Sequence, residues 1–243
     1  MKKVLLTGGN GLLGRKLTEL CPEIIAPPRE ECELEIKGSV DQAIGKYQPD
    51  ILIHAAAMTN NRLVESDPAR AIASNIIGSA HVAIACLKSG IRLVYVSTDY
   101  VYRGNRERYK EDDEIYPFNF YAWTKLGGES AVRACPDHLI IRTSFGDDAF
   151  EHPAAFIDKW SSKDTVSTIA PMIWEAALSD LKGIVNIGTA RKTVYEYATK
   201  CAGGKDIRPI RVVESSHPTP VDTSLDLTRW LKFLDDKKKA GIK

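Results

Sequence analysis

The chain starts with a short apolar segment that runs directly into a glycine-rich loop. Residues 4–6 read as a strand, and the loop 7–14 (TGGNGLLG) connects them to a helical stretch that ends near Cys21. Glycines at 8, 11 and 14 suit a backbone that turns tightly, approaches a pyrophosphate and packs a helix against a strand. The amides of the helix start can then hold a phosphate. We therefore expect a dinucleotide cofactor on Gly8, Asn10, Gly11, Leu12, Leu13 and Gly14.

Strand and helix signals alternate along the rest of the chain. Further strands are predicted at 23–26, 50–53, 91–96, 139–142 and 184–187. Helices are predicted at 39–47, 67–88, 121–134, 170–181 and 193–202. This alternation predicts an α/β fold: a Rossmann-type doubly wound parallel sheet. We expect a cofactor-binding domain with the catalytic residues in 1–145, and a small, shortened C-terminal substrate-binding lobe in 146–243 that is interleaved with the last sheet elements.

Charge and cysteine content limit the classes of partner. The chain has 33 Lys plus Arg against 32 Asp plus Glu, a net charge of +1, which gives no electrostatic reason to bind nucleic acid or an anionic membrane. The basic and acidic runs in 103–114 cancel and predict a solvated loop. Cysteines and histidines lack ligand spacing, no signal-peptide pattern is seen, and no apolar run approaches the ~20 residues of a membrane span. We expect a cytoplasmic protein with a small-molecule ligand and no metal.

A tyrosine and a lysine one helical turn apart carry the clearest chemical signal. Tyr121 and Lys125 share one face of the predicted helix, so the ammonium can lie beside the phenol. A nearby cation favours ionisation of a phenol whose isolated pKa is ~10, which makes it a usable proton donor near neutral pH. The alternative is a solvated lysine stem packed on a ring. With a nucleotide loop upstream, the pair indicates carbonyl reduction.

Four more motifs follow the glycine loop in a fixed order. They are IHAAAMT at 53–59, SNIIG at 74–78, STDYVY at 97–102 and YAWTKLGGE at 121–129. Together with the loop they resemble an extended short-chain dehydrogenase/reductase across about the first 145 residues. Within that superfamily the chain is most similar to the dTDP-4-dehydrorhamnose reductases, which have STDYVF and YGxTKLxGE-type segments in the same order, and the tail segment 220–226 (PVDTSLD) is also similar.

The resemblance implies roles for four catalytic residues. Thr98 is expected to hydrogen-bond the substrate carbonyl, although a strand-end hydroxyl can also simply cap a turn. Tyr121 is expected to supply a proton to the oxygen as hydride arrives, and Lys125 to bind the nicotinamide ribose and lower the pKa of the tyrosine. Asn75 is expected to brace the site, through water to the lysine. His54 is interpreted as a local structural hydrogen-bonding residue.

The end of the second predicted strand indicates the cofactor. Arg29 suits a 2′-phosphate, so NADPH is favoured, while one of the glutamates in 30–33 could instead bind the ribose of NADH. Glu35 and Ile36 align with an Asp-Ile pair that flanks the adenine in similar enzymes. Small side chains after the third strand are expected to line the cofactor, although a strand end of small residues predicts the same sequence: Ala55, Ala56 and Ala57.

The substrate half resembles the family less. Between 142–144 and 183–186 the chain is shorter than related reductases and lacks their Gly-Ser/Cys-Pro-Thr turn. Asp99 and Tyr100 are expected to contact the sugar, and Phe145 to stack on the base. Trp160 or Trp174 could stack likewise, but aromatic residues at such positions more often lie in the core.

The resemblance implies an NAD(P)H-dependent reductase of a 4-keto-6-deoxy nucleotide-sugar, in deoxysugar biosynthesis, with hydride to C4 and Tyr121 as proton donor. Three alternatives stay open. A 3,5-epimerase/4-reductase needs an extra acid/base pair, and no cysteine falls in the loop after Tyr100 to serve in one. A 4-epimerase would retain NAD without net turnover. A non-catalytic NADP-binding regulatory subunit, like the β subunit of methionine adenosyltransferase, fits the shortened substrate segment. A homodimer is possible in each case.

Overall fold

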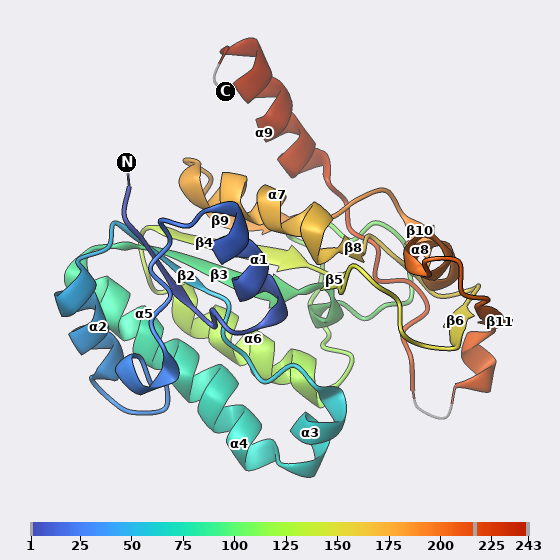
Figure 1. The fold of residues 1–243 in the computed structure, drawn as a ribbon, viewed down its shortest axis with the longest axis horizontal. Helices are drawn as coiled ribbons and strands as arrows, with labels where there is room; N and C mark the ends of the chain where they lie inside the picture. The colour runs from blue at the N-terminus through green and yellow to red at the C-terminus, as the bar shows by residue number, and fades with distance from the viewer. Residues whose placement is uncertain (1, 216–217, 242–243) are drawn as a thin grey trace.

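A parallel sheet forms the centre of the computed structural model, which describes residues 2–215 and 218–241 (Figure 1). All neighbouring strands pair in parallel. Their order across the sheet is β1 (Val4–Thr7), β2 (Ile51–His54), β3 (Arg92–Thr98), β4 (His138–Thr143) and β9 (Gly183–Asn186). Buried apolar runs of this kind are typical of parallel strands covered on both faces.

Helices cover both faces of this sheet (Figure 1). One face packs against α1 (Leu12–Leu20) and α7 (Val166–Leu178), and Trp230 of α9 (Thr228–Lys239) joins the same apolar cluster. The other face packs against α2 (Ser39–Tyr47), α5 (Gly78–Ser89) and α6 (Phe120–Val132). The predicted doubly wound α/β fold is therefore confirmed.

The predicted second strand is wrong in extent. In place of a strand at 23–26, Ile25 makes a single parallel bridge to Leu5 on the free side of β1. Its amide donates to the Val4 carbonyl (2.9 Å) and its carbonyl accepts from Leu6 (2.8 Å). The ladder ends there because the two prolines that follow, at 27 and 28, have no N–H to donate.

The long helix predicted at 67–88 is present but irregular. It comprises α4 (Pro68–Ile72), a π-helical segment η2 (Ala73–Ile77) and α5, and Gly90 ends it with a positive φ of 65°. A short helix before it, α3 (Asn61–Ser66), was not predicted. By length and composition alone, the helix from Pro68 to Ser89 is long and apolar enough to cross a membrane, whereas no such apolar run was expected from the sequence. It packs as a layer against α2 and α6, with 44% of its most apolar stretch buried.

A set of short strands, one α-helix and one 3-10 helix lies beyond the carboxyl ends of the sheet (Figure 1). We call this part, with the loops that join its elements, the C-terminal lobe. Not all of the described chain after residue 145 lies within it, because α7 and β9 return to the central layers. Two strand pairs lie within the lobe: β6 (Ala154–Phe156) with β11 (Arg208–Ile210), and β7 (Trp160–Ser161) with β10 (Lys192–Thr193). A third strand of the lobe, β8 (Asp164–Thr165), pairs with β5 (Phe145–Gly146). The helical elements of the lobe are α8 (Val194–Cys201) and η4 (Val212–Glu214).

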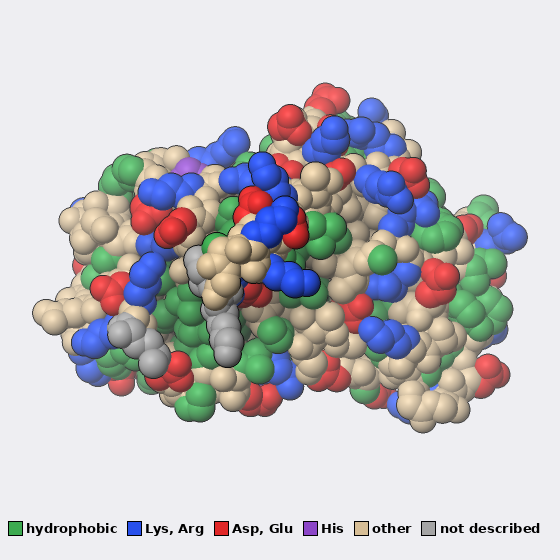
Figure 2. All heavy atoms as spheres, turned by 90° about the horizontal axis from the view of Figure 1, so that it is seen from above, with side chains coloured by type: hydrophobic (Ala, Val, Ile, Leu, Met, Phe, Trp, Pro, Cys, Tyr) green, Lys and Arg blue, Asp and Glu red, His purple; other side chains and the backbone are tan. Residues whose placement is uncertain are grey.

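Two segments are more ordered than the sequence predicts. The tail at 237–239 is the last turn of α9, whose Trp230 is buried. The 103–114 loop exposes most of its charges as expected, but Tyr109 is buried in it and stacks on Tyr102 at 4.7 Å between ring centroids. On the face seen from above, Lys and Arg side chains alternate with Asp and Glu (Figure 2), in keeping with the balanced charge.

Candidate active site

The glycine loop after β1 has the geometry that its spacing predicts. Gly8 has a φ of 82°, and a Cβ there would lie 2.7 Å from the Ala56 nitrogen. A Cβ on Gly14 would lie 2.1 Å from the Gly8 carbonyl oxygen, so both positions need glycine for close packing. Helix α1 begins after Gly11 without a side-chain cap. Its first N–H groups are thus available to a phosphate, and the loop fits a dinucleotide.

A cavity of 740 Å³ extends from this loop over the end of β1. Among the expected cofactor residues, its wall contains Gly8, Asn10, Gly11, Arg29, Glu35, Ala55, Ala56 and Ala57. Ile36 is not part of this wall and is 60% exposed, so the structure does not support its placement beside the adenine. The size and lining suit the adenosine half of a dinucleotide.

Arg29 reaches this cavity already paired with carboxylates. Its guanidinium forms an ion pair with Glu33 and another with Glu35, the latter at 3.3 Å. The Arg29 guanidinium, by hydrogen bonding and by its charge, holds the pKa of Glu33 below its usual range. A 2′-phosphate on Arg29 would therefore displace or share these partners, while either glutamate alone suits a ribose hydroxyl.

A second cavity of 420 Å³ is lined by three of the four expected catalytic residues and by the expected substrate residues. It shares Gly8, Gly11, Ala55 and Ala57 with the first cavity, so the two form one continuous site. The expected residues in its wall are Leu12, Leu13, Gly14, Thr98, Asp99, Tyr100, Tyr121, Lys125 and Phe145. The helix pair and the strand-end threonine, distant in sequence, thus face the same space.

The phenol of Tyr121 lies in an environment that disfavours its ionisation. Burial raises the pKa of Tyr121, the Asp99 carboxylate raises it further, and the hydrogen bond with Thr98 acts in the opposite direction. Asp99 is itself buried, which raises its pKa to about 6. The direction for Tyr121 is opposite to the lowering that was expected from Lys125. In this structure the phenol holds its proton, which is the form that a proton donor needs.

Lys125 is buried beside the ring of Tyr95. Its Nζ lies 4.0 Å from the ring centroid, a cation–π contact. Burial lowers the pKa of Lys125 to about 7, and the Glu129 carboxylate one turn further along α6 acts against that shift. The ammonium has one face toward the cavity, where ribose hydroxyls would be its hydrogen-bonding partners.

A chain of buried hydrogen bonds lies beneath the cavity. Thr7 Oγ1 is 2.7 Å from His54 Nδ1, His54 Nε2 is 3.0 Å from Ser79 Oγ, and Ser79 Oγ donates to the Asn75 carbonyl at 2.7 Å. Because Ser79 uses its proton on Asn75, Nε2 of His54 is the donor and Nδ1 accepts from Thr7. Burial lowers the pKa of His54 to about 3, so the ring is neutral. His54 is a structural hydrogen-bonding residue, as interpreted from the sequence.

Asn75 braces the site through protein contacts. Its side chain accepts from the Met58 amide (2.7 Å) and donates to the Met58 carbonyl (3.0 Å) and to Thr124 Oγ1 (2.9 Å). Asn75 lies in the π-helical segment η2, and such segments are frequent at functional sites. The side chain holds the loop after β2 against the residue that precedes Lys125, but it does not line either cavity.

A buried ion pair fixes the strand ends to α6. Glu129 accepts from Arg142 Nε (3.1 Å) and Nη2 (2.8 Å), and from Ser97 Oγ (2.5 Å). Arg142 also donates to the Tyr102 hydroxyl at 2.9 Å. Glu129 and Arg142 are almost fully buried, and each carries the compensating partner that a buried charge requires. This pair locks α6, and with it Tyr121 and Lys125, to β3 and β4.

Two of the expected substrate residues contact later parts of the chain, outside the central sheet. Asp99 accepts a 2.7 Å hydrogen bond from Thr223, and the Tyr100 hydroxyl accepts one of 2.8 Å from Lys159. Trp160 does not line the cavity, because its ring is covered by the Arg191 guanidinium at 3.8 Å. Trp174 packs against the apolar core on the α1 side of the sheet. A place in the core was the alternative to stacking on the base.

Several residues of the site have no signal in the sequence motifs. Arg15 donates to the Asn10 carbonyl at 2.7 Å, and it lines the first cavity with Arg70. Lys163 of the C-terminal lobe lines the second cavity. Helical periodicity from the glycine loop could have found Arg15, one position after Gly14, but nothing local marks Lys163. In the described ranges 2–215 and 218–241, no three His, Cys, Asp or Glu residues group as metal ligands.

A parallel doubly wound sheet, a glycine loop after its first strand, and a Thr-Tyr-Lys set at its carboxyl edge define an extended short-chain dehydrogenase/reductase. Comparison with known proteins gives the family. A model described as the RmlD substrate binding domain matches residues 1–170, and the chain belongs to this family.

Similar proteins cover nearly the whole chain. A dTDP-4-dehydrorhamnose reductase of Streptomyces griseus is 32% identical in an alignment of length 274, which covers 98% of this chain and 88% of that protein. Methionine adenosyltransferase 2 subunit beta of Xenopus laevis is 37% identical in an alignment of length 283, which covers 99% of this chain and 83% of that protein. The crystal structure of a Bacillus anthracis dTDP-4-dehydrorhamnose reductase in complex with NADP matches with a TM-score of 0.84 and 27% identity, over 96% of this chain and 91% of that one. The resemblance stated from the motifs is confirmed.

Proposed function

We propose that the protein is an NADPH-dependent oxidoreductase that reduces a 4-keto-6-deoxy nucleotide-sugar, of the dTDP-4-dehydrorhamnose reductase type, in deoxysugar biosynthesis in the cytoplasm. The observation that carries the proposal is the single cavity into which Thr98, Tyr121 and Lys125 face beside the glycine loop. The S. griseus reductase and the NADP complex of the B. anthracis reductase support the reaction and the cofactor.

The proposed chemistry assigns one task to each side chain. A bound nicotinamide supplies the hydride. The Thr98 hydroxyl and the Tyr121 phenol hydrogen-bond the substrate carbonyl oxygen, and the phenol, kept protonated by burial, transfers its proton to that oxygen. Lys125 holds ribose hydroxyls and places a positive charge near the phenolate that remains, which favours proton transfer. Asn75 and the Glu129–Arg142 pair keep these groups in position.

The reaction is tested directly by turnover. The purified protein is incubated with NADPH and a panel of dTDP- and UDP-4-keto-6-deoxysugars, and the loss of reduced-nicotinamide absorbance is followed. We expect turnover with at least one of them. The absence of turnover on every member of the panel would overturn the reductase proposal. An epimerase would instead interconvert sugars without consuming NADPH.

A second candidate is a non-catalytic regulatory subunit, favoured by the X. laevis relative named methionine adenosyltransferase 2 subunit beta. The short lobe between β5 and β9 also fits it. The two functions are separated by mixing the protein with a methionine adenosyltransferase catalytic subunit and measuring association by analytical ultracentrifugation. Association without turnover on any sugar supports the subunit, whereas turnover supports the reductase.

A homodimer through the α4–α5 and α6 layer is part of the proposal. Large apolar side chains are exposed there, including Ile77, Ile84 and Leu87 along one helix and Trp123 on α6. Apolar side chains gathered on neighbouring helices are typical of a protein interface, and a second copy of the chain carries the same face. Light scattering after size-exclusion chromatography is expected to give a dimer, and Ile84→Glu a monomer.

A further inference from the structure

Lys163 reaches the ligand cavity from the C-terminal lobe. It lies in the turn between β7 and β8, and it lines the 420 Å³ cavity together with Gly11, Gly14 and Tyr121. The glycine loop of the same cavity has the free amides that suit a phosphate. An ammonium group and a phosphate-binding loop therefore face a common space from opposite parts of the fold.

Within residues 2–215 and 218–241, Nζ of Lys163 makes neither a hydrogen bond nor an ion pair, and its contact with a protein group is a cation–π contact. Its nearest aromatic contact is the ring of Tyr197, 5.0 Å away. Gly146 makes room for it, because a Cβ there would lie 3.0 Å from Nζ and 2.5 Å from the Tyr197 hydroxyl. The missing side chain at position 146 thus leaves space for the Lys163 ammonium, which forms no ion pair with a carboxylate of the described residues.

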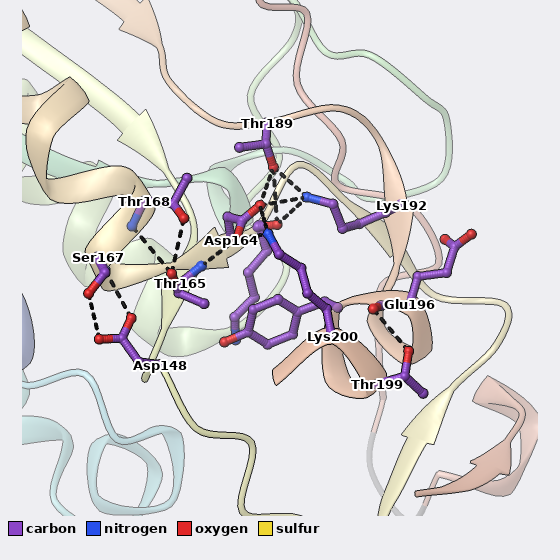
Figure 3. Close-up of polar contacts among 12 residues, drawn as sticks. Asp148, Asp164, Thr165, Ser167, Thr168, Thr189, Lys192, Glu196, Thr199 and Lys200 are labelled. Atoms are coloured by element: carbon purple, nitrogen blue, oxygen red, sulfur yellow. Dashed lines mark hydrogen bonds and ion pairs between the residues drawn. The ribbon is translucent and has the colours of Figure 1, made fainter. Parts of the chain in front are cut away.

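The neighbouring carboxylate is occupied elsewhere. Asp164 accepts from Lys192 and Lys200, each at 3.1 Å, and from Thr189 at 3.0 Å, and Figure 3 shows both lysines pointing at it. Although burial acts against it, the Thr165 amide and these ammonium groups hold the pKa of Asp164 below its usual range. Asp164 fastens β8 to β10 and α8, which fixes the turn that carries Lys163.

The remaining charges near Lys163 do not form a closed pair. Burial lowers the pKa of Lys163, the Asp99 carboxylate acts against that shift, and the nearby Lys159 ammonium adds to it. Asp99 is already hydrogen-bonded by Thr223 (2.7 Å) and Thr98 (3.3 Å), while Lys159 donates to the Tyr100 hydroxyl. Two ammonium groups against one carboxylate leave this end of the cavity positive, which suits an anionic ligand group.

We propose that Lys163 is a diphosphate-binding residue whose ammonium contacts a phosphate oxygen of a ligand in the cavity. Two ligands of the site contain a diphosphate, the dinucleotide cofactor and the nucleotide-sugar. The second of these sources rests on the proposed function, while the first rests only on the glycine loop. A lysine binds phosphate as a point charge, so the contact strengthens binding without demanding one fixed orientation.

The test measures binding, so it does not depend on turnover. Dissociation constants for NADPH, dTDP, UDP and thymidine are determined by calorimetry for the wild type, Lys163→Met and Lys163→Arg. Lys205→Met is the matched control, because Lys205 is a lysine of the same lobe that pairs with Glu151 at the surface, is 60% exposed in its side chain and does not line the cavity. Thermal unfolding of each variant confirms that it is folded.

Lys163→Met is expected to weaken one class of diphosphate by about tenfold (~1.4 kcal/mol). Weaker NADPH binding alone assigns the contact to the cofactor, and weaker dTDP or UDP binding alone assigns it to the nucleotide-sugar. Either result supports the proposal. Lys163→Arg should retain most of the affinity, and thymidine binding should not change. Unchanged constants for all three diphosphates, or an equal loss with Lys205→Met, would overturn the proposal.

A measurement on the unaltered protein covers the case in which the methionine variant does not fold. Crystal structures of the wild type with NADPH and with dTDP are expected to place Nζ of Lys163 at ~2.7–3.2 Å from a phosphate oxygen in one of them. If Nζ lies more than ~6 Å from every phosphate oxygen in both complexes, the proposal is wrong. This outcome is independent of whether any sugar is reduced.

Discussion

The carboxyl edge of the sheet and the C-terminal lobe hold their ligand-facing groups by different means. At the sheet edge, Thr98 and Lys125 lie on regular elements and are almost fully buried, and the Glu129–Arg142 pair joins those elements. In the lobe, Lys163 lies between two strands of two residues each, and the next residue, Asp164, pairs with the partly exposed Lys192 and Lys200. The first arrangement fixes the positions of reacting groups, and the second leaves room for variation in what is bound.

This contrast explains how much the sequence predicted. The glycine loop, the central strands and the Tyr121–Lys125 helix follow from local periodicity and motif spacing, and all of them are found. The missed items depend on distant contacts. Ile25 pairs only once because of the prolines after it, and α9 forms because Trp230 packs into the core on the α7 side. The turn of Lys163 is anchored by Lys192, 29 residues further along.

The largest expected effect is at the sheet edge. Tyr121→Phe removes the proton donor but keeps the ring, so kcat should fall by ~10²–10⁴ while the dissociation constant for NADPH stays nearly the same. Steady-state kinetics and calorimetry provide these values. Tyr116→Phe is the control, because Tyr116 is 54% exposed and lies outside both cavities. A Tyr121→Phe variant with full activity would contradict the mechanism.

The two regions should also differ in what their ionic anchors contribute to stability. Glu129→Ala leaves Arg142 buried without its partner and is expected to lower the free energy of unfolding by ~3–5 kcal/mol. Asp164→Asn should have a smaller effect, because Lys200 is 59% exposed in its side chain and can be solvated instead. Urea denaturation followed by circular dichroism measures both. Equal losses would remove the distinction between a rigid edge and an adaptable lobe.

The buried lysine predicts a pH dependence of stability. Burial lowers the pKa of Lys125 to about 7 in the folded protein, against 10.5 as its ordinary value. Between these values the unfolded chain binds one proton more than the folded one, so this group makes the folded state more stable as pH rises through that window. Lys125→Met removes the effect.

The comparison of wild type and Lys125→Met is made by denaturation at several pH values from 7 upward. The stability advantage of the methionine variant should shrink by ~1.4 kcal/mol per pH unit in that window. Lys88→Met serves as the control, since Lys88 is a lysine 63% exposed in its side chain on α5. A difference that does not change with pH would show that Lys125 is not desolvated.

The smallest expected effect concerns the choice between NADPH and NADH. Glu33→Gln removes one carboxylate from Arg29 and frees the guanidinium for a 2′-phosphate. The ratio of NADH to NADPH dissociation constants should rise about threefold (~0.6 kcal/mol), a modest change because Arg29 is exposed and surface ion pairs contribute little. Fluorescence titration of both cofactors measures this ratio. A fall in the ratio would mean that Glu33 does not compete with the phosphate.

The most direct test of the account follows the hydride. NADPH carrying deuterium at the transferable C4 position is incubated with the protein and a dTDP-4-keto-6-deoxysugar, and the product is examined by mass spectrometry and NMR. The account predicts one deuterium, bound to C4 of the sugar, because Thr98, Tyr121 and Lys125 line one cavity beside the glycine loop. A product without deuterium at C4, or a cofactor that keeps it all, would contradict the assignment of this site to carbonyl reduction.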